Sequence, residues 1–177
     1  MTLIEVGKTL DIERMLKYID KTQFTPVEKQ SIKHMLKIVI PQGSDDITID
    51  FEDFKKVIKH GKTALYGIGE HSGYNSAVEA MKSSIKSLFS NITFIQRFKG
   101  ILVHFTIHPS TNIMTLLEAM KIVDQNSEAD ILFGISTDNS VDKHYVKVSI
   151  LVTGFVIYNK KQLIINCTTY RKYEVEI

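Results

Sequence analysis

Three glycines near the middle of the chain have a spacing that could serve phosphate binding. Gly67, Gly69 and Gly73 lie at the exit from a predicted strand and precede a predicted helix. Glycines in that place let backbone N–H groups approach a phosphate at the start of a helix. The spacing is one residue longer than the dinucleotide-binding fingerprint, however, and no basic residue lies in the loop. A tight turn that needs a positive φ angle is therefore the simpler interpretation.

Two aspartates lie three residues apart at the start of a predicted short helix, at positions 50 and 53. Asp50 can accept a hydrogen bond as the helix N-cap, and Asp53 can return a bond and favour the helix dipole. Spacing alone requires no further role for them. The helix also carries a basic cluster that is typical of a solvated face, made of Lys55, Lys56, Lys59, His60 and Lys62.

Two further pairs of polar residues are candidates for chemistry. Glu70 and His71 adjoin the glycine turn and could exchange protons in a cleft, although the sequence supplies no partner for them. His104 and His108 share one face of a predicted strand, but four residues of strand span about 13 Å. One zinc ion, with Zn–N bonds of about 2 Å, cannot reach both. We therefore expect surface or interface histidines, and no metal.

Hydrophobic periodicity and capping signals indicate the elements that must position these residues. Thr25, Pro26 and Glu28 predict the start of a helix over 26–39, and Asp11 predicts the N-cap of a shorter helix over 11–19. The other predicted elements are a short helix opened by Phe51, a strand over 62–69, a helix over 76–89, a strand over 100–108, a helix over 111–123, and strands over 130–136, 145–155 and 162–169.

This order of strands and helices indicates an α+β or α/β fold with a mixed sheet and helices packed mainly on one face. The strand over 100–108 alternates apolar and polar residues, so one face should be packed and the other partly polar. The helix over 111–123 is rich in Ile, Met and Leu and is predicted to be a core helix. The residues at 159–161 are typical of a hairpin turn between the last two strands.

Length and composition exclude several classes of protein. The 177 residues suit one domain with a small appendage, and 44% hydrophobic and 24% charged residues are ordinary for a globular chain. A net charge of +2 gives no reason to expect nucleic acid or an anionic membrane as a partner. The single Cys167, a predicted half-buried strand residue, excludes an intramolecular disulfide. We expect a cytoplasmic protein, because residues 1–14 lack signal-peptide features.

Five blocks of sequence resemble the C-terminal domain of FtsZ, the bacterial tubulin homologue that polymerises at the division site. In chain order they are ITIDFEDF, GKTALYGIGEHSGYNSAVEAM, KGILVHFT, ADILFGISTD and VKVSILVTGF. The resemblance covers residues 47–155 and implies an α+β domain with a four-stranded mixed sheet and helices mainly on one face. We accordingly divide the chain into an N-terminal helical lead-in over 1–46, the FtsZ-like domain over 47–155 and a C-terminal β extension with the hairpin over 156–177.

In the FtsZ family, acids in the loop ahead of this domain reach GTP bound to the next subunit and orient the attacking water. The resemblance places Asp50 and Asp53 in those two positions, with Thr48 where the family usually has asparagine. Thr48, Phe51 and Phe54 are the interface residues expected beside them. A carboxylate can polarise water near a γ-phosphate only with a nucleotide site opposite it.

The family's GTP-binding half carries a glycine-rich phosphate loop, whereas residues 1–46 contain only Gly7 and Gly43. We therefore expect no GTP hydrolysis by this chain alone and no bound cofactor. Its acids would act only in trans, on a nucleotide held by another subunit.

These features predict an interaction protein of a bacterial tubulin and cell-division system. Its partner would be an FtsZ-type or tubulin-like protein, or a second copy of the chain, and it would cap or modulate filaments through the loop with the two aspartates. An alternative is a small-ligand protein or enzyme on a chorismate-mutase-like sheet, by analogy of fold alone. Such a site needs convergent basic residues, for which Arg97 and Arg171 are the candidates. A third interpretation is an excised fragment that has lost its partner.

Overall fold

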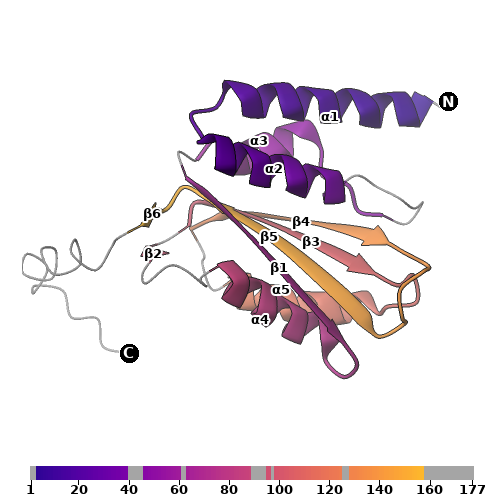
Figure 1. Cartoon of the computed structure of the whole chain (residues 1–177). Helices are drawn as coiled ribbons and strands as arrows, with labels where there is room; N and C mark the ends of the chain where they lie inside the picture. The colour runs from indigo at the N-terminus through magenta and orange to yellow at the C-terminus, as the bar shows by residue number, and fades with distance from the viewer. Residues whose placement is uncertain are drawn as a thin grey trace, which may run out of the picture.

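The computed structural model describes residues 3–39, 46–60, 63–88, 95–96, 98–124 and 128–157. Figure 1 shows how the helices and strands of this part of the chain are arranged. In chain order they are α1 (Leu3–Lys21), α2 (Pro26–Val39), α3 (Phe51–Ile58), β1 (Ala64–Ser72), α4 (Ser76–Leu88), β2 (Ile95–Gln96), β3 (Gly100–Ile107), α5 (Ile113–Asp124), β4 (Asp130–Thr137), β5 (Tyr145–Thr153) and β6 (Val156–Ile157).

A four-stranded mixed sheet forms the centre of the domain. Its strand order is β1-β5-β3-β4, with β3 and β4 parallel and the other two neighbouring pairs antiparallel. β2 and β6 pair separately in a short antiparallel ribbon. Parallel neighbours need a crossover connection, and α5 makes it between β3 and β4. The predicted α+β class with a four-stranded mixed sheet is confirmed.

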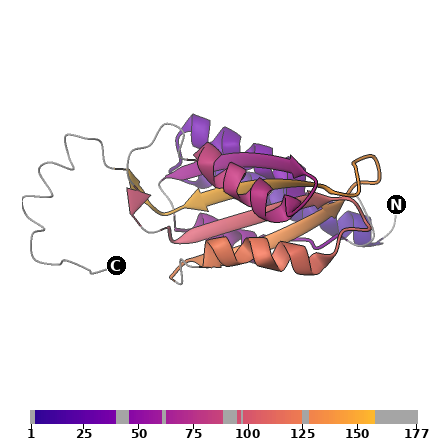
Figure 2. The same cartoon turned by 90° about the horizontal axis from the view of Figure 1, so that it is seen from below.

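Helices cover both faces of this sheet (Figure 1). α4 and α5 lie on one face, where Figure 2 shows them side by side across the strands. α1, α2 and α3 form a layer on the opposite face. The prediction placed the helices mainly on one face of the sheet. The two helices that follow β1 and β3 share one face, and the helices that precede the sheet add a second layer on the other.

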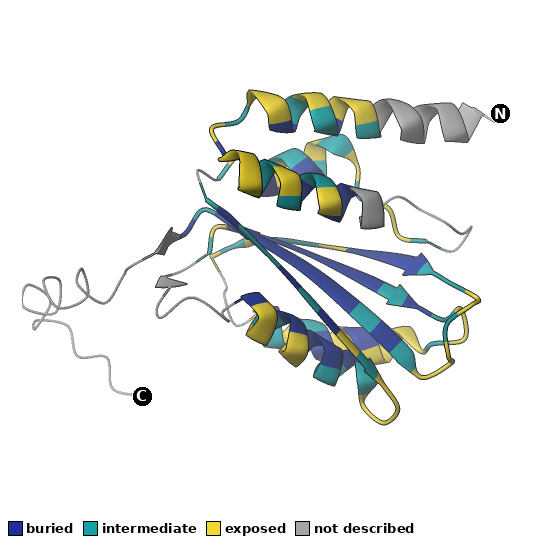
Figure 3. Cartoon of the chain, in the orientation of Figure 1, coloured by how far each residue is buried: buried dark blue, intermediate teal, exposed yellow. Residues whose placement is uncertain are grey.

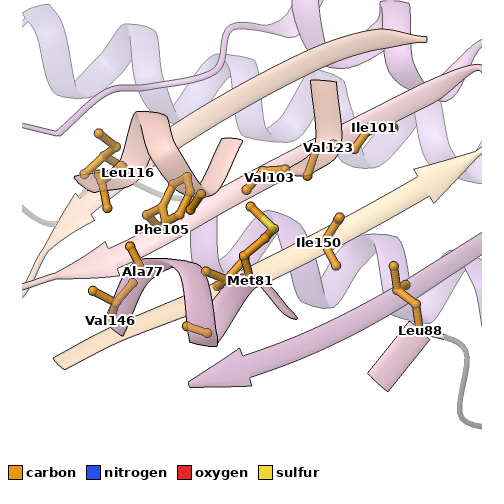
Figure 4. Close-up of a cluster of buried hydrophobic side chains, with 14 of the residues drawn as sticks. Ala77, Met81, Leu88, Ile101, Val103, Phe105, Leu116, Val123, Val146 and Ile150 are labelled. Carbon is orange, nitrogen blue, oxygen red and sulfur yellow. The ribbon is translucent and has the colours of Figure 1, made fainter. Parts of the chain in front are cut away.

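The first hydrophobic core lies between the sheet and the α4 and α5 layer (Figure 4). Met81 of α4 and Phe105 of β3 meet there with 0% of their surface exposed. Full burial of side chains of this size contributes about 1.5–3 kcal/mol each.

Two glycines of β1 allow α4 to lie close to the sheet. A Cβ atom on Gly69 would come within 2.2 Å of the carbonyl oxygen of Ala80, and one on Gly67 within 2.5 Å of that of Ser84. The prediction of turn geometry is therefore wrong for these two glycines, because they lie inside β1. Only Gly73, with a φ angle of 107°, has the turn geometry that was predicted.

The second core lies between the other face of the sheet and the N-terminal helices. Its buried side chains include Ile19, Met35 and Phe54 from the helices, and Figure 3 shows the central strands buried along most of their length. β3 is consequently buried on both faces, and His104 is only 1% exposed. The predicted partly polar face is present, since it carries His104 and the half-exposed Thr106, but α3 packs over this face of β3.

Capping signals predicted α2 well. It begins at Pro26 and ends at Val39 as expected, and the N–H of Thr25 donates a 2.8 Å bond to the Glu28 carboxylate. The N–H of Glu28 donates in return to the Thr25 hydroxyl at 3.3 Å. The other carboxylate oxygen of Glu28 accepts a 3.0 Å bond from the N–H of Ala64, which ties the start of α2 to β1.

α1 is longer than the helix predicted over 11–19. Asp11 lies inside α1 and is not its N-cap, so that part of the prediction is wrong. The predicted hairpin and strand over 159–169, including Cys167, lie outside the described residues, as do Lys62, Arg97 and Arg171. None of the helices in the described ranges is long and apolar enough to cross a membrane.

Candidate functional site

The acid loop, defined as residues 46–53, starts along the outer edge of β4 and includes the first residues of α3. Ile47 forms an isolated antiparallel bridge with Ile135 of β4, and both of its backbone hydrogen bonds measure 3.0 Å. Because β4 is the last strand on its side of the sheet, the loop takes the place of a further strand there. Both predicted acids are therefore held at one edge of the domain.

Asp50 is the N-cap of α3. Its backbone is extended, with φ −80° and ψ 172°, and its carboxylate accepts a 2.8 Å hydrogen bond from the N–H of Asp53. Its carbonyl accepts the first helical bond, from the N–H of Phe54, at 3.0 Å. The predicted capping role is confirmed. The residue is nevertheless exposed, so a carboxylate oxygen can still meet an incoming molecule.

The Asp53 carboxylate was predicted to return a hydrogen bond to the N-cap residue, and this prediction is wrong. The carboxylate accepts a 2.6 Å hydrogen bond from the ammonium group of Lys56 instead. An aspartate is one methylene shorter than the glutamate or glutamine usual at this place in a capping box. The hydrogen bond to Asp53 raises the pKa of Lys56. Asp53 thus carries a partly neutralised charge while its side chain stays 39% exposed.

The three predicted interface residues have unlike surroundings. Thr48 is exposed on the acid loop, whereas Phe54 is 1% exposed and belongs to the second core. Phe51 is half-buried under α1, where the guanidinium of Arg14 lies 4.3 Å from its ring centroid and Tyr18 packs edge-on at 6.0 Å. Of the three side chains, Thr48 is the one that lies open to a partner.

The residues around the glycine turn lie far from the acid loop. β1 and β4 are opposite edges of the sheet, so the structure does not bring Glu70 and His71 near the two aspartates. Glu70 instead accepts a 2.6 Å hydrogen bond from the hydroxyl of Tyr145. Burial, together with this bond, raises the pKa of Tyr145 to about 12. Glu70 therefore ties β1 to the neighbouring β5.

A cavity of about 590 Å³ opens beside the glycine turn, between the loops that precede α4 and α5. Lys143 and His144, from the loop between β4 and β5, supply the basic side chains that the turn itself lacks. The backbone N–H of Gly73, however, donates a 3.1 Å hydrogen bond to the carbonyl of His144. That N–H group closes the turn, which agrees with the turn interpretation.

His104 lies inside β3, whereas His108 follows the end of this strand. His104 is buried, and its Nε2 lies 3.0 Å from the hydroxyl of Ser136. Burial lowers the pKa of His104 to about 4, against a smaller opposing effect of Asp46. His108 is half-exposed and forms a 2.7 Å bond with the hydroxyl of Ser110. The prediction of a surface or interface position is wrong for His104, and within the described ranges no three metal-ligating side chains cluster.

Most of the exposed large hydrophobic residues lie on the acid loop, on β4 and on α5. Seven large hydrophobic residues are exposed in the described part of the chain, and five of them lie on α5, on β4 or on the loop bridged to β4. These five form the apolar patch: Ile47, Ile113, Met114, Leu117 and Phe133. Between 38% and 61% of each residue is exposed. A concentration of exposed apolar residues on one side of a domain marks an interaction surface.

α5 was predicted as a core helix, and only one of its faces is core. Leu116, Ala119 and Val123 are buried against the sheet, whereas the apolar side chains at 113, 114 and 117 are exposed. The signal for this surface was present in the sequence, because the apolar residues of α5 spread over more of the helix than the single stripe that faces the sheet.

The basic cluster on α3 is a solvated, paired face in the described residues. Lys55 lies 3.6 Å from Glu52, and Lys59 lies 3.7 Å from Asp130. His60 lies 2.6 Å from the same Asp130, and this contact lowers the pKa of Asp130. The cluster therefore offers little unbalanced positive charge to a polyanion.

Comparison with solved structures defines the class of the fold. The chain is similar to an FtsZ dimer subunit from M. jannaschii, with 24% identity and a TM-score of 0.59 over 71% of this chain and 36% of that one. It is also similar to TubZ of Bacillus thuringiensis serovar israelensis in a GTPγS-form protofilament, with 15% identity and a TM-score of 0.52 over 90% of this chain and 47% of that one. The fold is therefore one that parts of FtsZ and TubZ share.

The model of the FtsZ family, C-terminal domain, matches residues 62–156. The chain belongs to the FtsZ family through this domain. It is 32% identical over 111 residues to the cell division protein FtsZ of Helicobacter pylori, and 32% identical over 110 residues to FtsZ 2 of Thermococcus kodakarensis. These matches cover 62% and 61% of this chain but 29% and 26% of the relatives. The chain thus spans less than a third of the length of these curated relatives.

Proposed function

We propose that this chain is an interaction module of a bacterial tubulin system that does not hydrolyse GTP by itself. It binds the nucleotide-carrying face of an FtsZ-type subunit with the acid loop and the apolar patch. The observation that carries this proposal is their adjacency. Ile47, which precedes Thr48 in the acid loop, belongs to both surfaces and is bridged to Ile135 of β4.

The two parts of this surface have complementary tasks. The apolar patch supplies area that gains free energy when it leaves water. The exposed Asp50 carboxylate supplies a group that can orient water on a phosphate held by the partner. Two similar solved structures come from a dimer and a protofilament, which are assemblies of subunits, and this supports a tubulin-like partner.

Binding by this module affects a filament in two separable ways. A subunit end covered by the module accepts no further subunit, so the module caps the polymer. The acid loop also meets the partner's nucleotide, so the module raises GTP hydrolysis in trans when Asp50 and Asp53 are correctly placed. The sequence supports the second activity less than the first, because Thr48 replaces the asparagine usual in the family.

The direct test combines sedimentation and GTPase measurements on the FtsZ-type protein of the source organism, with increasing amounts of this chain. Capping predicts less sedimented polymer at substoichiometric ratios, and catalysis in trans predicts more phosphate release per subunit. If neither quantity changes at a large molar excess of the chain, the proposed function is wrong.

A matched pair of variants separates capping from catalysis. Asp53→Ala removes a carboxylate that pairs with Lys56 at i+3, at 2.6 Å. Glu79→Ala removes one that pairs with Lys82 at the same spacing on α4, at 2.7 Å. Catalysis in trans predicts that only the first variant loses GTPase stimulation, while both still reduce sedimentation.

A further inference from the structure

We propose that Asp46 is a positioning residue that holds the acid loop in its active geometry against the edge of β4. This inference rests on the proposed function, because it concerns the presentation of Asp50 and Asp53 to a nucleotide on the partner. Asp46 does not touch that nucleotide in this proposal. It acts through the backbone of the loop.

The contact that carries the proposal joins Asp46 to the end of β4. One carboxylate oxygen of Asp46 accepts a 2.6 Å hydrogen bond from the backbone N–H of Thr137 and a 3.0 Å bond from its hydroxyl. Bonds to an ionised acceptor are stronger than bonds between neutral groups. The half-buried position of both residues limits the competition from water.

These bonds continue the pairing of the loop with β4. Ile47 and Ile135 exchange both backbone hydrogen bonds, and the next outward-facing N–H on β4 belongs to Thr137. In a regular antiparallel ladder a backbone carbonyl would accept that bond. The Asp46 side chain takes its place, so two successive positions of β4 hold the start of the acid loop.

The floor under the loop is made by Gly134. A Cβ atom there would lie 3.1 Å from the carbonyl oxygen of Ile47 and 3.3 Å from the Cδ1 atom of Ile49. The absence of a side chain at this position lets the loop lie directly on β4. A larger residue at this position would push the loop away from the strand.

The far end of the loop is fixed by α3. Phe54, Val57 and Ile58 are buried in the second core, and the N–H of Asp53 bonds to Asp50. Only positions 48–50 therefore span the gap between the anchor on β4 and the first turn of the helix. With both ends fixed, the Asp50 carboxylate is preorganised, which is the condition for orienting water on a phosphate.

The test uses two substitutions of Asp46 in the full chain. Asp46→Ala removes the acceptor, whereas Asp46→Asn keeps an oxygen that accepts both bonds from Thr137. Asp138→Ala is the matched control, because Asp138 accepts the same pair of donors, an N–H at 2.8 Å and a hydroxyl at 2.6 Å, from Ser140. Thr137→Val, which removes only the hydroxyl donor, serves if Asp46→Ala fails to fold.

Hydrogen exchange at the N–H groups of Ile47 and Asp53 gives the first measurement. Loss of the anchor predicts exchange about tenfold faster at both sites in Asp46→Ala, a clearly smaller increase in Asp46→Asn, which keeps a neutral acceptor, and unchanged exchange in Asp138→Ala. Thr137→Val should speed exchange at both sites by a smaller factor. Unchanged exchange at Ile47 and Asp53 in Asp46→Ala overturns the positioning role, whether or not the chain acts on FtsZ.

GTPase stimulation of the FtsZ-type partner gives the second measurement. A positioning role predicts that Asp46→Ala lowers the maximal stimulation about tenfold without changing the half-saturating concentration, and that Asp46→Asn restores it. Equal maximal stimulation in Asp46→Ala and the wild-type chain overturns the proposal. Absence of stimulation by the wild-type chain contradicts the catalytic part of the proposed function, and the exchange measurement then decides the role of Asp46 by itself.

Discussion

The backbone N–H of Asp53 donates a 2.8 Å hydrogen bond to the carboxylate of Asp50. The residue that caps α3 is therefore the same residue that the family resemblance assigns to catalysis in trans. A substitution that removes the carboxylate changes two properties at once unless the replacement can still cap the helix. The choice of replacement separates the two roles.

The variants Asp50→Ala and Asp50→Ser both lack the carboxylate and differ only in whether the new side chain can cap α3. Serine accepts the N-cap bond almost as well as aspartate, whereas alanine cannot, so we expect Asp50→Ala to lower the free energy of unfolding by about 1 kcal/mol. Asp50→Ser should stay close to the wild-type stability. Urea unfolding measures this difference.

Both substitutions remove the carboxylate, and both should abolish stimulation of the partner's GTPase. If Asp50→Ser retains the stimulation, the Asp50 carboxylate serves the helix and has no part in hydrolysis. A stable Asp50→Ser chain that still reduces sedimentation would leave capping as the activity of the module.

Leu117→Glu tests the apolar patch. Leu117 is 42% exposed on α5, and leucine and glutamate have similar helix propensities, so stability should change by less than about 0.5 kcal/mol. A charge in a buried interface is costly to desolvate, and the variant should no longer reduce sedimentation of FtsZ. Co-sedimentation measures the loss of binding.

Val27→Glu is the control for that variant. Val27 is 76% exposed on α2, in the helix layer on the other face of the sheet from α5. The Val27→Glu chain should bind the partner as the wild-type chain does. Equal binding by Leu117→Glu and the wild-type chain would exclude the patch from the interface.

Gly69→Ala should destabilise the fold by about 3 kcal/mol, a typical upper value for overpacking. The new Cβ atom would lie 2.2 Å from backbone atoms of both Ala80 and Ser84, so α4 must move away from the sheet. Gly73→Ala is the comparison. The surroundings of Gly73 are open, so the only strain on an alanine there comes from the φ angle of 107°. That substitution should cost about 1 kcal/mol. Thermal unfolding of the two variants measures the difference, and equal costs would contradict the close packing of α4.

His104 makes stability depend on pH. Burial lowers its pKa from 6.5 to about 4 in the folded chain, so between these values the unfolded chain binds a proton that the folded chain does not. The contribution of neutral His104 to the free energy of unfolding is therefore fully present above about pH 6.5 and is lost as the pH falls to about 4. The loss amounts to about 3 kcal/mol.

His104→Asn removes this titration and is the reference for it. Urea unfolding of both chains across that pH range should show a steeper loss of stability in the wild-type chain. Parallel curves would mean that His104 does not titrate differently in the two states.

Local signals in the sequence were sufficient for α2 and for the cap of α3. Thr25 and Glu28, like Asp50 and Asp53, lie three residues apart, so one helical turn brings each pair together whatever the rest of the chain does. Alternation and periodicity also located the strands of the mixed sheet. They could not show that β3 is covered on both faces, because a pattern of polarity does not say which element packs on it.

The amino-acid sequence alone was enough for the helices and strands of the central domain, for the mixed sheet and, through the order of the FtsZ-like blocks, for the family. The exposed side of α5 and the anchoring of the acid loop followed only from the tertiary structure. Asp46 and Thr137 are 91 residues apart, and no local preference links them. They meet because β4 forms the outer strand of the sheet, so the N–H of Thr137 has no neighbouring strand to bond to and is open to the Asp46 carboxylate. Long-range contacts of this kind depend on how the elements pack, and packing follows from the burial of all of them together.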